Sequence, residues 1–350
     1  MPSFDDSAIY GVAVHRVGNQ AAGESLALSE GLLPLDDRLR GLLLQYFITP
    51  FKVQEYYHLG DQEGRGNEVL EAVEAIFDDP ESLLEESRRL AELLFGASTH
   101  PNIKSGDLFV VYFDECQING EVTNAVGLFK AENQSQFLKV LHGEGDKWES
   151  NFRVEADQGI DIKHLDKGAL IFNSEREKGC VVSVVDATNR SADAAYWRDT
   201  FLGLVQRQDE YFNTHAELTA YKKFVTDELP QQFEGVSSAD RADLLNKSVK
   251  YFKQNDNFDV DSFAEEVIQQ PEVIESFKEY RRQYSEEHQT ELPDEFAISE
   301  EAVKKQSRVF KSVIKLDKNF HIYVHGNREL IEQGEDEKGK FYKVYYHEES

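Results

Sequence analysis

Positive charge is concentrated in one short segment near the end of an acidic chain. Residues 304–328 hold seven Lys or Arg side chains and a single acid, Asp317, for a net +6, whereas the whole 350-residue chain carries −28. Ammonium and guanidinium groups neutralise phosphates without reading bases, and an acidic protein approaches nucleic acid only where its field reverses sign. The segment, with Phe310, Phe320 and Tyr323 interleaved, therefore predicts a sequence-nonspecific DNA contact. The candidate contact residues are Lys304, Lys305, Arg308, Lys311, Lys315, Lys318 and Arg328.

Other interpretations of this segment remain open. Lysines on the edge of a β-ribbon prevent aggregation, and cations in the last turn of a helix interact favourably with its dipole. The preceding residues, 265–301, carry twelve acids and three bases, a net charge of −9. This charge fits a solvated helix face. It also fits an acidic surface that competes with DNA for the cations or docks a basic partner.

A weaker pattern for metal-dependent chemistry lies in the middle of the chain. Asp161 and Lys163 form a D-x-K tripeptide, with Asp146 and Glu155 upstream. In metal-dependent nucleases such carboxylates hold Mg²⁺, and the lysine steadies the attacking water or the phosphate. Because D-x-K arises by chance in a chain with 30% charged residues, we interpret the pair as surface charge and expect no catalytic residue. A metal-dependent nuclease or a phage-defence effector is the enzymatic alternative.

No other motif for catalysis or cofactor binding is found. The sequence lacks a P-loop, a strand–GxGxxG–helix unit, GxSxG, HExxH, CxxC and an EF-hand loop. His321 and His325 would project from one face of a strand about 13 Å apart, which is too far to share one metal ion. We therefore expect neither a metal nor a cofactor.

Composition indicates a folded cytoplasmic protein. An apolar fraction of 40% is ample for a packed core, and 350 residues suit two domains. Cys116 and Cys180 lie in apolar β-like runs, which predicts buried, inert thiols in a reducing compartment. The N-terminal residues do not resemble a signal peptide, and no apolar run approaches the roughly 20 residues of a spanning helix. We expect no membrane contact.

The first of two predicted domains, 1–187, mixes helices with an antiparallel-type sheet of five or six strands. Asp36 or Asp37 should cap a helix that ends at Pro50. Asn119 and Gly120 give a strong turn signal between two strands. Strands are predicted at 8–17, 107–117, 121–131, 151–156, 168–173 and 180–186, and further helices at 67–78 and 80–95.

The second predicted domain, 188–350, is helical and ends in a basic β-hairpin at 304–346. Asp259 and Pro271 are start signals for two of its helices. From residue 312 the apolar period changes to alternation, and 312–326 and 341–348 read as the hairpin strands. Helices are predicted at 191–212, 214–228, 238–254, 259–269 and 272–288. The expected fold class is α+β.

Long strings of this sequence resemble a known family. They include AIYGVAVHRVGN and LLLQYFITPF, DATNRSADAAYWRDTFLGLVQRQDEYFNT, and FKSVIKLDKNFHIYVHGNRELIEQGEDEKGKFYKVYY. Over about residues 6–346 the chain resembles the bacterial nucleoid-associated protein family of the YejK/NdpA type. The resemblance implies a cytoplasmic protein that accompanies the nucleoid, with no established enzymatic activity and no cofactor. It supplies no catalytic residues.

Residues and resemblance together predict a non-enzymatic nucleoid-associated protein. It would bind DNA weakly, or a DNA-processing protein, or both, through its C-terminal part. Because members of the family are generally acidic, association through nucleoid proteins stands beside direct DNA contact. A protein-interaction scaffold without DNA contact is a further alternative, and self-association as a homodimer is left open.

Overall fold

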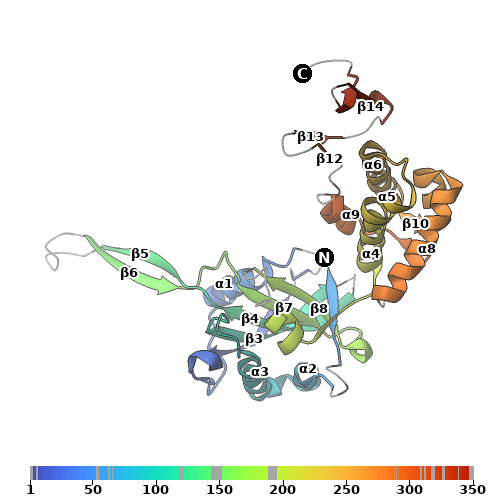
Figure 1. The fold of residues 1–350 in the computed structure, drawn as a ribbon. Coiled ribbons are helices and arrows are strands. Elements are labelled where there is room, and N and C mark those ends of the chain that lie inside the picture. The colour runs from blue at the N-terminus through green and yellow to red at the C-terminus, as the bar shows by residue number, and fades with distance from the viewer. Residues whose placement is uncertain are drawn as a thin grey trace. The chain divides into compact units, whose positions relative to one another are not determined.

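The computed structural model comprises two compact units, Met1–Arg207 (unit 1) and Gln208–Ser350 (unit 2) (Figure 1). The boundary between the units along the chain lies twenty residues beyond the predicted boundary at 187/188, because residues 204–206 add a strand to the sheet of unit 1. The structure describes residues 3–4, 7–52, 55–61, 64, 66–118, 121–142, 152–187, 195–288, 290–307, 310, 313–316 (backbone only at 313 and 315), 320–324, 328–337 and 339–346.

Unit 1 is built on a seven-stranded antiparallel sheet with the order β1-β3-β4-β7-β8-β2-β9. The hairpin predicted at the Asn-Gly signal is confirmed, because Ile118 pairs with Glu121. The strands are β1 (Ala8–Val17), β2 (Tyr56–Leu59), β3 (Gly106–Ile118), β4 (Glu121–Ala131), β7 (Lys167–Phe172), β8 (Val181–Asp186) and β9 (Leu204–Gln206).

Helices cover both faces of this sheet (Figure 1). α2 (Glu68–Asp78) and α3 (Leu83–Ala97) pack on one face, and α1 (Asp37–Ile48) packs on the other. Successive side chains of a strand alternate between faces, so Val110 joins the α2–α3 core while Phe109 packs against Phe47 of α1. As predicted, Asp36 caps α1 by accepting the N–H of Leu39 at 2.7 Å. Short 3₁₀ turns, η1 (Gln20–Ala22), η2 (Pro80–Ser82) and η3 (Arg176–Lys178), connect these elements.

Both cysteines are buried in unit 1, as predicted. Burial raises the pKa of the Cys116 thiol to about 11 and that of the Cys180 thiol to about 12. Both thiols are therefore protonated at neutral pH, and a protonated, buried thiol is a poor nucleophile.

The long helix predicted over 191–212 is wrong. Residues 188–194 lie outside the described residues, Tyr196–Phe201 form a single π-helical turn (η5), and Leu204–Gln206 form β9. Gly203 between them has a φ of +60°, a conformation that glycine adopts without strain, and it ends the helical run. Tyr196, Trp197 and Phe201 of this one turn pack into the core of unit 1, whereas Tyr211 belongs to the next helix, α4 (Glu210–Lys223).

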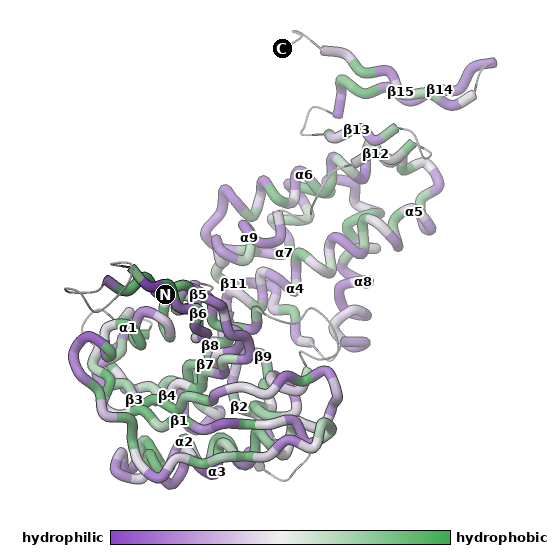
Figure 2. The backbone as a smooth tube through the Cα atoms, turned by 90° about the vertical axis from the view of Figure 1, so that its left-hand side faces the viewer, coloured by the Kyte–Doolittle hydropathy of each residue, from purple (hydrophilic) through white to green (hydrophobic). Residues whose placement is uncertain are grey.

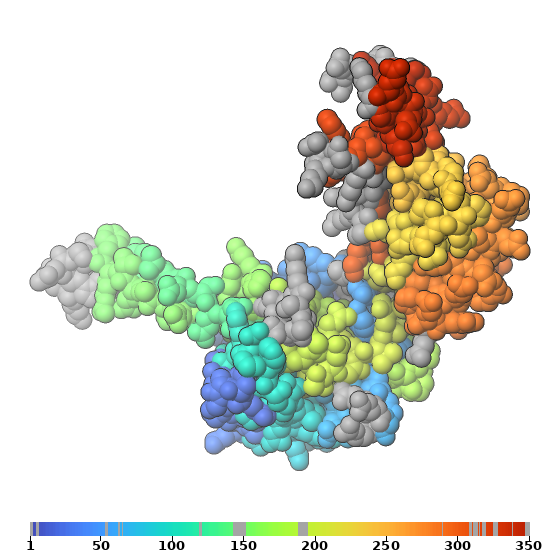
Figure 3. Space-filling model, in the orientation of Figure 1, coloured from blue at the N-terminus to red at the C-terminus, as the bar shows by residue number. Residues whose placement is uncertain are grey.

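A two-stranded ribbon, here called the arm, projects from the rest of unit 1 (Figures 1 and 3). It consists of β5 (Ser135–His142) and β6 (Phe152–Gly159), which pair antiparallel at eight positions. The strand predicted at 151–156 falls on β6, but the sequence does not predict β5. Phe137 and Leu138 are adjacent, as are Val140 and Leu141, so β5 lacks the simple alternation of a strand with one buried face.

Unit 2 packs helices around an aromatic core that includes Tyr221, Phe252, Phe263 and Phe277. Asp259 caps its helix as predicted, by accepting the N–H of Ser262 at 2.7 Å. The helices are α4 (Glu210–Lys223), η6 (Phe224–Glu228), α5 (Leu229–Gln232), α6 (Ser238–Gln254), α7 (Val260–Phe263), η7 (Ala264–Ile268), α8 (Pro271–His288) and α9 (Glu300–Ser307). A small hairpin joins β10 (Asn257–Asp259) to β11 (Glu295–Ala297).

The C-terminal part of unit 2 contains two hairpins instead of the single one predicted. β12 (Val313–Leu316) pairs with β13 (Phe320–Tyr323), and β14 (Ile331–Asp336) pairs with β15 (Gly339–Val344). The predicted strand at 312–326 is thus two strands, which pair antiparallel from Val313 with Tyr323 to Leu316 with Phe320. In the sequence between them, Asp317 and Asn319 are residue types that favour turns.

The C-terminal hairpins lie near one end of α6 (Figure 2), and both contribute to a small apolar cluster on that helix. Ile314 and Ile331 are buried there against Ala239 and Ala242. An antiparallel sheet flanked by helices in unit 1, followed by the mainly helical unit 2, confirms the α+β fold class. In the described part of the chain, no helix is long and apolar enough to cross a membrane.

Candidate nucleic-acid interface

The candidate interface begins on α9, whose charges follow its dipole. Glu300 and Glu301 lie in the first turn, and Lys304 and Lys305 lie in the last. Ala302 and Val303 are buried, where α9 packs against α4 and α6. Lys305 donates a hydrogen bond to the Tyr211 hydroxyl at 2.8 Å, with its Nζ 5.4 Å from the centre of that ring. Lys304 is exposed. The packing of α9 against α4 and α6 holds the backbone of both lysines in place.

A second helix brings a cation to the same place. Lys253, near the end of α6, lines a pocket of about 540 Å³ together with Lys304. Lys250 lies one turn earlier on α6, and both α6 lysines are exposed. The sequence analysis missed these two residues because about fifty residues separate them from the cationic segment. In the sequence, the only local signal for them was that Lys250 and Lys253 are three residues apart on the helix predicted at 238–254.

The hairpin β12–β13 exposes two aromatic side chains within the predicted cationic segment. Lys315 lies opposite His321 in the register. Phe320 and Tyr323 are exposed, as expected for residues that could stack on bases or sugars. Phe310, the third predicted aromatic, is instead buried in the aromatic core.

Arg328 is engaged in a tertiary contact. Its Nε lies 2.7 Å from Asp240 Oδ1, and its guanidinium also donates to the backbone carbonyl of Ile331. Asp240 is part of the capping box of α6 with Ser237. Burial alone would raise the pKa of Asp240, but hydrogen bonds from Ser237 and Arg328 outweigh it and lower that pKa. Arg328 thus ties the start of β14 to the first turn of α6.

The remaining predicted cations are only partly described. Arg308, Lys311 and Lys318 lie outside the described residues, and Lys315 is described by its backbone alone. The structure therefore brings Lys304 together with Lys253, places Lys305 against Tyr211 and assigns Arg328 an ion pair. All of these residues belong to unit 2.

The D-x-K pair lies in a turn between β6 and β7. Asp161 Oδ1 accepts the backbone N–H of Lys163 at 2.9 Å, and Lys163 is exposed. Glu155 lies on the arm and pairs with Arg153 at 3.0 Å, while Asp146 lies outside the described residues. No group of three or more potential metal-ligating side chains is found among the residues that the structure describes. The predicted surface role of Asp161 and Lys163 fits this geometry.

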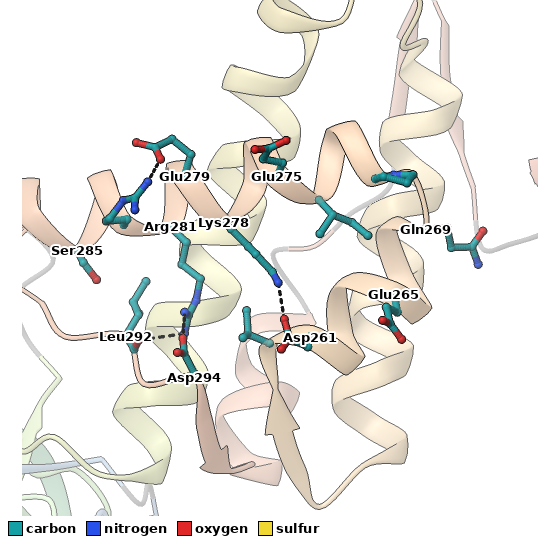
Figure 4. A pocket seen from close by; sticks show the side chains of 14 residues that line it. Asp261, Glu265, Gln269, Glu275, Lys278, Glu279, Arg281, Ser285, Leu292 and Asp294 are labelled. Atoms are coloured by element: carbon teal, nitrogen blue, oxygen red, sulfur yellow. Dashed lines mark hydrogen bonds and ion pairs between the residues drawn. The ribbon is translucent and has the colours of Figure 1, made fainter.

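Unit 2 also contains an open groove of about 1060 Å³ along α8 (Figure 4). Each lysine and arginine among the described lining residues pairs with a carboxylate, so a phosphate entering the groove would have to displace one. The pairs are Lys278 with Asp261, Arg281 with Asp294, and Arg282 with Glu279. The groove is therefore a weaker candidate for nucleic acid than the α6–α9 region.

The fold and the site define an acidic α+β protein in which exposed lysines of α6 and α9, Lys253 and Lys304, line one pocket of unit 2. Residues 13–340 match the family described as nucleoid-associated protein YejK, and the chain belongs to this family. A comparison with curated proteins finds no match. The resemblance stated from the sequence is thus confirmed, and the family supports a nucleoid-associated role.

Proposed function

We propose that this protein binds DNA weakly and without sequence preference through the C-terminal part of unit 2. The observation that carries the proposal is the local reversal of charge in a chain of −28, together with its placement. Lys304 and Lys253 are exposed around one pocket, and Phe320 and Tyr323 are exposed on the next hairpin. Cations supply phosphate affinity, and aromatic faces supply stacking that tolerates any sequence.

The acidic residues of unit 2 should keep this binding weak. The cations and the acids of 265–301 belong to the same unit, and α9 carries both signs. Opposite charges attract over a Debye length of about 8–10 Å. We propose that these acids compete with phosphate for the cations and that DNA-processing or nucleoid proteins also bind through this part of the chain. The protein is proposed to act without an enzymatic step.

Salt dependence of DNA binding tests the proposal. Fluorescence anisotropy with a labelled duplex should show affinity falling steeply with salt, with a slope of about 0.9 per phosphate contacted. The variant Lys253→Glu/Lys304→Glu should flatten that slope by roughly two units. The matched control, Lys163→Glu/Lys178→Glu, makes the same change in net charge at two exposed lysines of unit 1. Equal effects from both variants would show that only total charge matters.

Two further measurements separate the alternatives. A pull-down from bacterial lysate, with and without nuclease treatment, shows whether the link to the chromosome runs through DNA or through protein. Failure of the wild type to bind DNA at low salt, with capture that survives nuclease, would favour the scaffold. Mg²⁺- or Mn²⁺-dependent cleavage of DNA, abolished by Asp161→Ala, would establish a nuclease.

A further inference from the structure

The arm has two chemically different faces. Directly opposed residues of an antiparallel pair lie on the same face, and faces alternate along each strand. One face carries every charge of the two strands: Lys139, Arg153, Glu155 and Asp157. The other face is uncharged. Its six residues beyond the two root glutamines, here called the apolar stripe, are Leu138, Val140, His142, Phe152, Val154 and Ala156.

The charged face is satisfied within the arm itself. Lys139 pairs with Asp157 at 2.7 Å, and Arg153 pairs with Glu155 at 3.0 Å. The Lys139 ammonium also lies 5.5 Å from the centre of the Phe137 ring. This face has equal numbers of cations and anions and is suited to remain in water.

The apolar stripe is exposed to solvent. Leu138 is 71% exposed, Val140 53%, Val154 60% and Phe152 59%, and His142 packs edge-on against Phe152 at 5.0 Å. Among the described residues, none of the arm belongs to a hydrophobic cluster of unit 1. A two-stranded ribbon is marginally stable alone, and a contiguous exposed apolar patch marks an interaction site.

The root of the arm is held by a buried polar network. Lys130 at the end of β4 is fully buried and donates to Tyr196 at 3.0 Å and to Glu132 at 3.1 Å. Asp166 accepts the backbone N–H groups of Glu132 at 2.7 Å and Asn133 at 2.9 Å. This network fixes the chain where it leaves the sheet, so the arm is presented from a rigid base.

We propose that the apolar stripe is the contact surface for the stripe of a second copy of this chain. An uncharged stripe can meet its own copy across a two-fold axis without burying an unpaired charge. Two chains of −28 repel each other. Each arm extends about 26 Å along its eight residues, so contact between arms keeps the acidic bodies beyond the Debye length of about 8–10 Å.

The same features disfavour DNA as the occupant of the stripe. The stripe carries no lysine or arginine, and both cations of the opposite face are paired. The contact is small, because a ribbon face of about 26 by 10 Å buries on the order of 500 Å² over two copies, below a standard stable interface. The dimer should therefore be weak and depend on concentration. This inference is independent of the proposed DNA contact.

Sedimentation velocity over about 1–200 µM protein tests the proposal. The wild type should shift from 40.1 kDa towards twice that mass, and added salt should change the association little, because the acidic bodies stay beyond the Debye length. Val140→Glu places a charge on the stripe and should weaken association roughly tenfold or more. Leu141→Glu, the neighbouring position on the charged face, is the matched control and should behave as the wild type.

A cross-linking experiment holds even if a glutamate disturbs the ribbon. Both native cysteines are fully buried, so Leu138→Cys introduces an accessible thiol on the stripe, and Leu141→Cys places one on the opposite face. A short bis-maleimide should give covalent dimers with Leu138→Cys and few with Leu141→Cys. A wild type that stays at 40.1 kDa throughout, or equal cross-linking by both variants, overturns the proposal.

Discussion

The arm and the hairpin β12–β13 have the same two-stranded architecture, but they differ in whether a helix of the same chain packs against their apolar residues. Each is a two-stranded antiparallel ribbon that has one face without charged residues. Ile314 of the hairpin is fully buried against α6, whereas Val140 of the arm is more than half exposed. Strand pairing satisfies the backbone but leaves an apolar face that needs a cover. The hairpin is covered within its own chain, and the arm is proposed to be covered by another copy.

Their surroundings also differ in charge. The arm has paired charges on one face and an uncharged stripe on the other, so it is suited to contact protein. The hairpin β12–β13 belongs to the segment of net +6, residues 304–328, which is suited to contact phosphate. In one acidic chain, two ribbons are thus proposed to make contacts of two chemical classes.

The largest expected effect concerns the root of the arm. Removing one member of a buried ionic network leaves its partner charged and without compensation, so Lys130→Ala should cost about 3–5 kcal/mol in unfolding free energy. Both tryptophans of the chain lie in unit 1, so urea unfolding followed by tryptophan fluorescence reports on this unit. The exposed Lys178→Ala is the control and should change stability by less than about 0.5 kcal/mol. A small effect of Lys130→Ala would contradict a rigid root.

Acid should weaken the unit that carries the arm. Burial, with a smaller contribution from the Arg88 cation, lowers the pKa of His15 to about 4, and His15 accepts the Ser29 N–H at 3.1 Å. Because the folded pKa lies below the ordinary value of 6.5, stability is complete above pH 6.5 and is lost as pH falls towards 4. The loss should reach about 3 kcal/mol. His15→Asn should remove this pH dependence from the tryptophan-monitored transition.

A pair of alanine substitutions tests the comparison directly. Ile314→Ala should lower the opening free energy of β12–β13 by about 2–4 kcal/mol, because it leaves a cavity against α6. Val140→Ala in the monomer should change the arm by about 0.5 kcal/mol or less, since the side chain is exposed. Hydrogen exchange of the strand amides in dilute protein measures both. Similar losses at the two sites would mean that the stripe is covered within the chain.

The smallest expected effects separate two cations of the same segment. Lys304→Gln should reduce the salt slope of DNA binding by about 0.9 and leave stability unchanged. Arg328→Gln should barely change the salt slope. It should lower the opening free energy of the hairpin β14–β15 by about 0.5–1 kcal/mol, because the ion pair of Arg328 with Asp240 is partly buried. If Arg328→Gln instead lowered the salt slope and left stability unchanged, Arg328 would be a phosphate contact.

Local signals in the sequence predicted local structure well. The cap at Asp36, the turn between β3 and β4, and the helix starts at Asp259 and Pro271 are all confirmed. Each depends on interactions or backbone preferences within a few positions: side-chain caps at Asp36 and Asp259, a turn sequence between β3 and β4, and the fixed φ of Pro271. The helix predicted over 191–212 failed because the apolar residues that suggested it are divided among one π-turn, the strand β9 and the helix α4. β5 was missed because its apolar residues occupy both faces.

The sequence by itself determined the family, the fold class, the total charge and the position of the cationic segment along the chain, since these are properties of composition and of long strings. Only the tertiary structure decided which cations lie close to one another. It brought Lys253 beside Lys304, and it paired Arg328 with Asp240, 88 positions away. It also decided that α6 covers Ile314 while nothing in unit 1 covers the stripe among the described residues. Such pairings depend on chain reversals between distant segments, which no local pattern of residues specifies.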